Sequence, residues 1–193
     1  MTRSTAALLA LLAAPAAGGP LGDALKARQA KLDPLLAAST GELSATQKKE
    51  IGDALAELID FTAMSRAALG EAWEKRSEAE RKDFVAAFSG LVRANSLRQV
   101  EVYRADAIEY LEETVEADRG SVRTTVKTRD AITDVVYGFE KVKGAWRVVD
   151  YAIDGVSAVK NYRAQFARIL EKKDWATLVA RLRKRQAEIE AGS

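Results

Sequence analysis

The chain has 193 residues, 48% of them hydrophobic and 30% charged, which suits one compact domain with a hydrophobic core and excludes a disordered chain. Its 30 Lys and Arg and 28 Asp and Glu leave a net charge of +2, which disfavours a nucleic-acid partner. Because the sequence has no His and no Cys, it cannot form a Cys or His metal site, a disulfide, a Ser-His-Asp triad or a Cys nucleophile. Any catalysis would therefore have to depend on carboxylates, Lys or Tyr.

The first 18 residues have the three parts of a secretory signal peptide. Arg3 supplies a positive charge, an unbroken apolar run spans Ala6–Ala14, and small residues follow it. This apolar run is shorter than the roughly 20 residues that span a bilayer, and no Cys follows it to accept a lipid anchor. We therefore expect a signal peptide at 1–18 and a single exported domain at 19–193, which in a bacterium with two membranes lies in the periplasm.

Hydrophobic residues at helical spacing predict helices from about residue 21 to the start of the sheet region near residue 107. The first helix covers roughly 21–38. Later helices carry start and end signals, which are the capping boxes Ser44–Gln47 and Ser77–Glu80, the N-cap Asp60 and the terminating Gly70. The helix after Ser77 is the longest, at about 30 residues by this criterion.

Near residue 107 the hydrophobic period changes from 3.6 to 2, and β-branched and aromatic residues become common. Four strands are predicted, at about 107–116, 121–128, 133–142 and 145–153. The short links between these strands imply an antiparallel meander. Two helices, at about 157–170 and 174–190, complete the chain. The predicted fold is α+β, with a curved antiparallel sheet of about four strands that helices cover on one face.

Two stretches of the sequence resemble the MlaC family of periplasmic phospholipid-binding proteins, also described as toluene-tolerance auxiliary components of ABC transporters. The first is Trp146–Phe166, which contains a Trp-x-Val-x-Asp strand, then Gly-Val-Ser, then Asn-Tyr-Arg-x-Gln-Phe. The second is Ile59–Gly70 followed by Trp73, which is similar to the Phe-Asp-Phe, Met-x-Arg and Ala-Leu-Gly-x-x-Trp segment of that family. The resemblance covers nearly all of the exported chain in the same order.

The resemblance implies a carrier that is not an enzyme, with no catalytic residues, no metal site and no cofactor besides the phospholipid that it carries. Such a protein takes phospholipid between an outer-membrane lipoprotein complex and an inner-membrane ABC transporter complex and helps to maintain the lipid asymmetry of the outer membrane. A phospholipid has about 30 chain methylenes, whose exposure to water costs on the order of 20 kcal/mol, so a carrier has to enclose them. The resemblance therefore implies an apolar cavity between the sheet and its helices.

The candidate wall of this cavity consists of aliphatic and aromatic residues from both layers. They are Phe84, Phe88, Leu91 and Leu97 of the longest helix, Val122, Val126, Tyr137, Phe139, Val149 and Tyr151 of the strands, and Tyr162 of the next helix. The same residue types form an ordinary hydrophobic core, and taken singly each position favours plain core. Only the family resemblance favours a lipid-binding wall, and it does so for the group.

Two other functions remain open at this stage. One is an enzyme that acts on a small hydrophobic substrate, in which Asp134 or Asp150 serves as a general base in an apolar pocket. The other is a periplasmic adaptor or chaperone that presents an apolar surface to protein partners.

Charged residues near the C-terminus have two interpretations each. For Arg163, an ion pair with Asp150 or Asp154 is favoured over contact with a phosphate head group. Four basic residues form a cluster in the last helix, which is either a solvated face or a surface for docking and anionic head groups: Arg181, Arg183, Lys184 and Arg185.

Overall fold

A computed structural model describes residues 18–37, 43–102 and 106–192. Nearly all of the predicted signal peptide lies outside the described residues. The helices are α1 (Pro20–Ala37), α2 (Ala45–Leu58), α3 (Phe61–Leu69), α4 (Glu71–Glu74), α5 (Glu78–Val102), α6 (Ala158–Lys172) and α7 (Trp175–Glu190). The strands are β1 (Ala107–Glu116), β2 (Arg119–Lys127), β3 (Ile132–Val142), β4 (Ala145–Ile153) and β5 (Val156–Ser157). Within the described ranges, no helix combines the length and hydropathy needed to cross a membrane.

Side-chain caps begin the helices at the residues that the sequence indicates. The Ser44 amide donates to Gln47 Oε1 at 3.0 Å, and the Gln47 amide donates to Ser44 Oγ at 3.3 Å. Ser77 and Glu80 exchange the same pair of hydrogen bonds, at 2.8 and 3.2 Å. The Asp60 carboxylate accepts from the third amide of α3 at 2.8 Å. Each cap satisfies an amide that the first helical turn leaves without a backbone partner.

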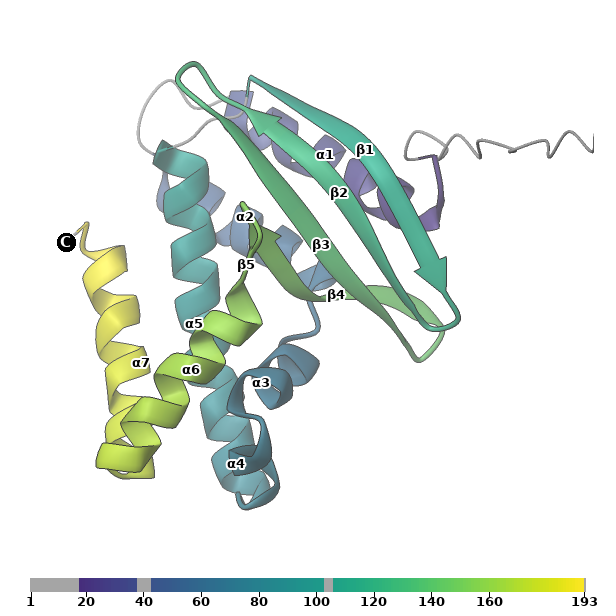
Figure 1. Cartoon of the computed structure of the whole chain (residues 1–193). Helices are drawn as coiled ribbons and strands as arrows, with labels where there is room; N and C mark the ends of the chain where they lie inside the picture. The colour runs from purple at the N-terminus through teal and green to yellow at the C-terminus, as the bar shows by residue number, and fades with distance from the viewer. Residues whose placement is uncertain (1–17, 38–42, 103–105, 193) are drawn as a thin grey trace, which may run out of the picture.

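The five strands form one open antiparallel sheet in the order β1-β2-β3-β4-β5. The predicted α+β class, with N-terminal helices before the sheet and two helices after it, is confirmed (Figure 1). Strands β1 and β4 have the predicted bounds, and β2 and β3 differ from them by one or two residues. The fifth strand was not predicted, because Val156–Ser157 is too short to show a period of 2.

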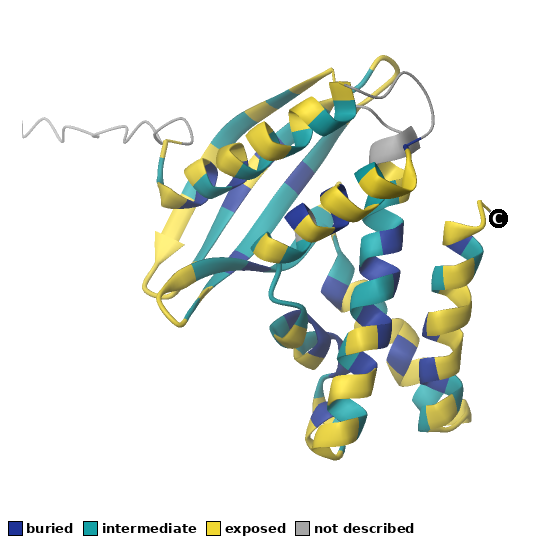
Figure 2. Ribbon diagram, turned by 180° about the vertical axis from the view of Figure 1, so that it is seen from behind, coloured by how far each residue is buried: buried dark blue, intermediate teal, exposed yellow. Residues whose placement is uncertain are grey.

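The two faces of the sheet differ in chemistry. On the inner face, which α1 and α2 cross, Val122 of β2 lies opposite Tyr137 of β3, and Tyr137 lies opposite Tyr151 of β4 (Figure 2). On the outer face, Arg123 pairs with Asp134 at 2.8 Å. The alternation of side chains along each strand therefore directs the apolar residues toward the helices and the charged ones toward solvent.

Buried side chains form two clusters. The helical cluster joins α3, α5, α6 and α7, with Phe84 and Phe166 near its centre. The sheet cluster joins α1 to β2, β3 and β4 through Leu21, Val122 and Phe139. The candidate site lies on the inner face of the sheet and at its junction with the helical cluster.

Candidate functional site

Helix α1 covers part of the inner face through a small apolar contact and several polar ones. Leu21 and Leu25 are its buried hydrophobic residues. The Glu113 carboxylate of β1 accepts hydrogen bonds from the Leu21 and Gly22 amides at 3.1 and 2.8 Å, so it caps the start of α1. The Tyr110 hydroxyl donates to Gln29 Oε1 of α1 at 2.8 Å. This cover is therefore held largely by polar contacts at its edge.

The inner face carries tyrosine rings whose hydroxyls stay neutral at ordinary pH. Burial raises the pKa of Tyr110 to about 12 and also raises the pKa of Tyr137 and Tyr151. The Lys26 ammonium lies 5.2 Å from the centre of the Tyr110 ring, at the α1 edge. The tyrosines thus supply aromatic surface with a polar end but no charge, which is compatible with an apolar ligand.

A pocket of about 350 Å³ lies where the inner face meets the helical cluster. Leu91 of α5, Tyr151 of β4 and Tyr162 of α6 line it, and all three belong to the wall expected from the sequence. Asn95 Nδ2 donates to the Tyr162 hydroxyl at 3.2 Å, and burial raises the pKa of that hydroxyl. The structure therefore brings these three candidate residues together around one open space.

The sequence analysis missed the other residues that line this pocket. Apolar members are Ile153, Val156 and Ala158, and polar members are Asn95, Asn161, Gln165 and Arg185. A sequence signal exists for the first two, because the Asp154-Gly155 dipeptide between apolar residues is typical of a two-residue hairpin turn. Arg185 belongs to the basic cluster that the sequence analysis names, but nothing there placed it at a pocket. The amide side chains carry no comparable signal, since amides at helical spacing are ordinary surface residues.

Phe84 and Phe88 lie in packed core in this structure. Both side chains are 0% exposed. The Phe84 ring centre lies 5.5 Å from those of Phe166 and Trp175, and the Phe88 ring centre lies 4.9 Å from that of Tyr162. Because neither residue borders a space that admits water, their place in a lipid-binding wall stays a prediction.

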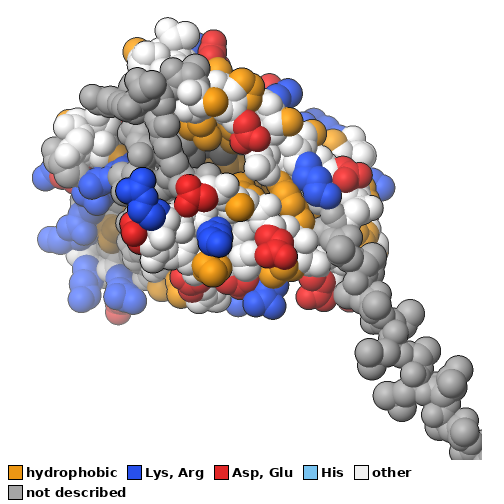
Figure 3. Space-filling model, turned by 90° about the horizontal axis from the view of Figure 1, so that it is seen from above, with side chains coloured by type: hydrophobic (Ala, Val, Ile, Leu, Met, Phe, Trp, Pro, Cys, Tyr) orange, Lys and Arg blue, Asp and Glu red, His pale blue; other side chains and the backbone are white. Residues whose placement is uncertain are grey.

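The remaining candidates lie on or near the inner face. Val122 and Phe139 are buried in the sheet cluster, whereas Val126 and Tyr137 are half-buried. Leu97, in the second half of α5, is also half-buried. Seen from above, the surface is hollowed near the middle of the view, and hydrophobic side chains gather around the hollow (Figure 3).

A β-bulge changes the expected position of Val149. The register between β3 and β4 shifts after Gly138, so that Phe139 lies opposite Val148 and not opposite Val149. Val148 is buried in the sheet cluster, and Val149 is the extra, half-buried residue of the bulge. Alternation alone cannot show which of two adjacent valines pairs across a bulge.

The turn from the sheet into α6 is organised by Asp150. Its carboxylate accepts hydrogen bonds from the Tyr151 amide at 2.8 Å, the Val159 amide at 3.0 Å and the Ser157 hydroxyl at 2.6 Å. Ser157 in turn caps α6 by accepting from the Lys160 amide at 3.0 Å. One carboxylate thus fixes the end of β4, the start of α6 and the segment between them.

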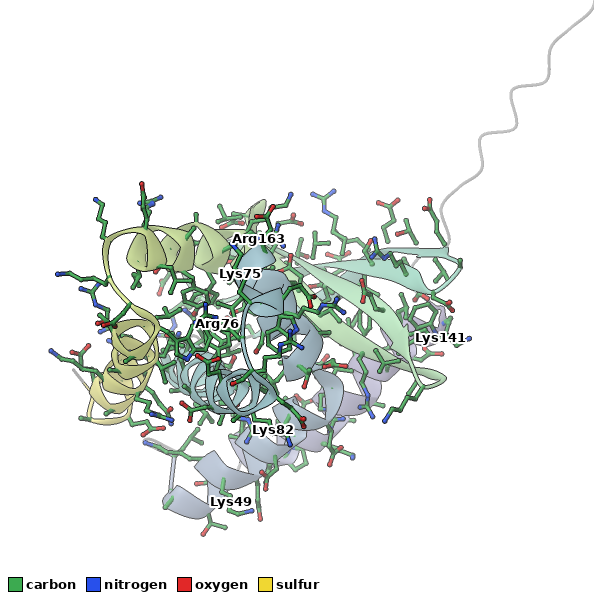
Figure 4. All side chains as sticks on the ribbon, turned by 90° about the horizontal axis from the view of Figure 1, so that it is seen from below. Lys49, Lys75, Arg76, Lys82, Lys141 and Arg163 are labelled. Atoms are coloured by element: carbon green, nitrogen blue, oxygen red, sulfur yellow. The ribbon has the colours of Figure 1, made fainter. Side chains whose placement is uncertain are left out.

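The expected ion pair of Arg163 was wrong. Arg163 donates two hydrogen bonds, at 2.8 and 2.6 Å, to the Ala67 carbonyl near the end of α3 (Figure 4). Last-turn carbonyls of a helix have no intrahelical partner, so a cation is favourable there. Asp150 is bound to the α6 corner, and Asp154 Oδ1 accepts from the Asp134 amide at 3.0 Å.

Neither carboxylate considered for catalysis lines the pocket. Asp134 is paired with Arg123 on the outer face, and Asp150 is occupied by its three hydrogen bonds. Among the described residues, no group of three or more acidic side chains is placed to hold a metal ion.

The fold belongs to a class of small α+β domains represented among solved structures. One is the phospholipid-binding protein from Ralstonia solanacearum in complex with a phospholipid, with a TM-score of 0.73 and 20% identity over 87% of this chain and 97% of that chain. The family described as MlaC protein matches residues 35–184. This chain belongs to the MlaC family, which confirms the resemblance seen in its motifs. No curated protein matches the sequence.

Proposed function

We propose that this protein is a periplasmic phospholipid carrier. It holds the acyl chains against the inner face of the sheet and moves lipid between an outer-membrane lipoprotein complex and an inner-membrane ABC transporter complex, with no covalent step. The observation that carries this proposal is membership of the MlaC family. The phospholipid in the solved Ralstonia solanacearum protein of the same fold adds support.

The chemistry of the inner face supports the same function. A buried charge costs several kcal/mol unless it is paired, so a cavity for acyl chains needs walls without free charges. The inner face offers valines, Phe139 and neutral tyrosines, while Arg123 and Asp134 face the other way. Glu113 is the acidic residue on this side of β1, and two α1 amides stabilise its charge by hydrogen bonding, so it is not left without a partner.

Binding a phospholipid requires the cover to move. Pockets for drug-sized ligands have volumes of about 300–1,000 Å³, and a two-chain phospholipid is larger than such ligands. The pocket of about 350 Å³ therefore accepts at most part of the lipid. Since α1 meets the sheet through Leu21, Leu25 and polar contacts at its edge, parting α1 from the sheet would expose further apolar surface of the inner face to the rest of the lipid.

Lipid extraction followed by mass spectrometry tests the proposal. The purified protein should contain phospholipid in a stoichiometric amount. Recovery of a small apolar metabolite would favour an enzyme, and a protein without any lipid would favour an adaptor or chaperone. Cell fractionation should place the protein in the periplasm in a form that lacks residues 1–18.

A matched pair of substitutions on β2 locates the site. Val126→Trp fills space on the inner face, so it should lower the bound phospholipid without changing the unfolding transition by more than a few degrees. Thr125→Trp adds the same ring to the outer face, because Thr125 lies opposite Asp134. It should leave the lipid content unchanged. Equal lipid content in two folded variants would place the acyl chains elsewhere.

A further inference from the structure

The β4–β5 hairpin presents two large apolar side chains to solvent. Asp154 and Gly155 form its two-residue turn, with φ angles of 47° and 80°, and Ile153 pairs with Val156 across it. Ile153 is 39% exposed and Val156 is 61% exposed. Single exposed apolar residues are common, but two neighbours at the tip of a hairpin form a small exposed apolar patch.

This hairpin tip forms one side of the pocket, and a basic side chain forms the other. Ile153 and Val156 line the pocket together with Arg185 of α7. Arg185 is paired with Glu188 at 3.0 Å and keeps about half of its side chain exposed. Arg181 lies one turn earlier on α7 and is exposed. The rim of the pocket therefore combines a small apolar patch with a cationic helix face.

Positive and negative charges are distributed unevenly between the C-terminal helices and the sheet. Residues 158–192 contain nine Lys and Arg and four Asp and Glu, whereas residues 106–157 contain seven Lys and Arg and eleven Asp and Glu. In the view from above, Lys and Arg side chains gather on the side where α7 lies (Figure 3). An anionic surface therefore attracts the C-terminal helices and repels the sheet, which turns the pocket rim toward it.

The base of the hairpin is held firmly. The Asp150 carboxylate binds the Val159 amide and the Ser157 hydroxyl, and the Asp154 amide donates to the Asp134 carbonyl at 2.8 Å. The tip is thus presented in a fixed position relative to α6, and contact with a surface requires little ordering of the hairpin.

We propose that this rim docks directly on a bilayer surface that contains anionic phospholipid. Ile153 and Val156 enter the boundary between head groups and acyl chains, and Arg181 and Arg185 contact the lipid phosphates. An apolar patch beside basic residues matches a bilayer surface, where an apolar layer lies beneath a layer of phosphates. This inference goes beyond the proposed function, since docking requires no phospholipid inside the protein.

Vesicle flotation with the purified full domain tests the proposal. The protein should float with vesicles of phosphatidylcholine that contain about one third phosphatidylglycerol, and less with phosphatidylcholine alone. Added salt should weaken the association, because it screens the charges. Arg185→Gln should reduce the partition coefficient about fivefold, since one basic residue contributes about a factor of this size at an anionic surface. Arg119→Gln, a change of an exposed Arg at the β1–β2 turn, should leave it unchanged.

The apolar tip is tested by unique fluorescent labels, because the natural sequence has no Cys. A polarity-sensitive dye on Val156→Cys should shift its emission to shorter wavelength when anionic vesicles are added. The same dye on Ile132→Cys should not shift, although Ile132, the first residue of β3, is 69% exposed. Circular dichroism confirms that both labelled variants are folded.

Three results would overturn the proposal: absence of flotation with either vesicle, equal shifts of the two labels, or a shift at position 156 that appears only with a protein partner. The lipid content of Arg181→Glu separates this inference from the proposed function, because Arg181 is exposed and does not line the pocket. That variant changes the surface charge by two, so it should lose vesicle binding by more than about tenfold while its bound phospholipid stays unchanged. A carrier that holds lipid but does not bind vesicles would retain the proposed function without the docking face.

Discussion

Replacement of Phe84 by Ala tests whether the helical cluster is packed core. Phe84 is 0% exposed, and its ring contacts those of Phe88, Phe166 and Trp175 at centre distances of 5.5–5.7 Å. Removing a fully buried Phe side chain costs about 3–5 kcal/mol in unfolding free energy. The stability of a domain is about 5–15 kcal/mol, so this loss is a large fraction of the total.

Urea denaturation followed by circular dichroism measures this loss. The midpoint concentration should fall while the slope m stays constant, because the surface exposed on unfolding hardly changes. The melting temperature should fall by roughly 6–20 °C, at about 2–4 °C for each kcal/mol in a domain of this size. The phospholipid content of each folded molecule should stay close to that of the wild type.

Ile132→Ala is the matched control, since it removes a similar apolar side chain from a position that is 69% exposed. Its unfolding free energy should change by no more than about 0.5 kcal/mol. A loss below about 1 kcal/mol in Phe84→Ala would refute the reasoning, because such a small cost means that Phe84 borders open space. If this variant also bound less phospholipid, Phe84 would belong to the wall of the binding site.

The remaining predictions concern the α6 corner and an exposed helix cap. Asp150→Ala should lower the unfolding free energy by about 2 kcal/mol or more, because the Val159 amide loses its acceptor; an unchanged urea midpoint would contradict this. Hydrogen bonds from Thr177 lower the pKa of Asp174 below its ordinary value of 3.8, so their contribution to stability is present above that value and is lost as the pH falls through the lowered pKa. Thermal melting below pH 3.8 should therefore depend less steeply on pH in Asp174→Asn than in the wild type, and identical slopes would disprove the role of this cap.

The secondary structure was predictable because its signals are local. The capping boxes at Ser44 and Ser77 and the cap at Asp60 each depend on side chains within three residues of the backbone groups they satisfy. The four main strands were predictable for the same reason, since alternation and turn residues are read within about ten positions. The order of these elements then limits the fold to a meander with helices before and after it.

The site was only partly predictable, because packing between distant segments decides it. Phe88 and Leu91 lie one turn apart on α5, yet Phe88 lies in packed core and Leu91 lines the pocket. The difference arises from α6, whose Tyr162 ring covers Phe88. Arg185, more than 80 positions further along the chain than Asn95, meets it at the pocket only through the packing of α7 against α5. The spacing of residues along the sequence does not predict contacts between such distant side chains.

The two clusters of buried side chains meet at Ile59, which packs against both. The Asp60 amide, next to it, donates to the Val148 carbonyl at 2.9 Å and ties the start of α3 to the sheet. Regions of one protein open with different free energies when they share few contacts. We therefore expect α1 to separate from the sheet and reclose while the rings around Phe166 keep their packing. Such a molecule would change shape reversibly, because the packed part that guides its return to the starting conformation would stay folded.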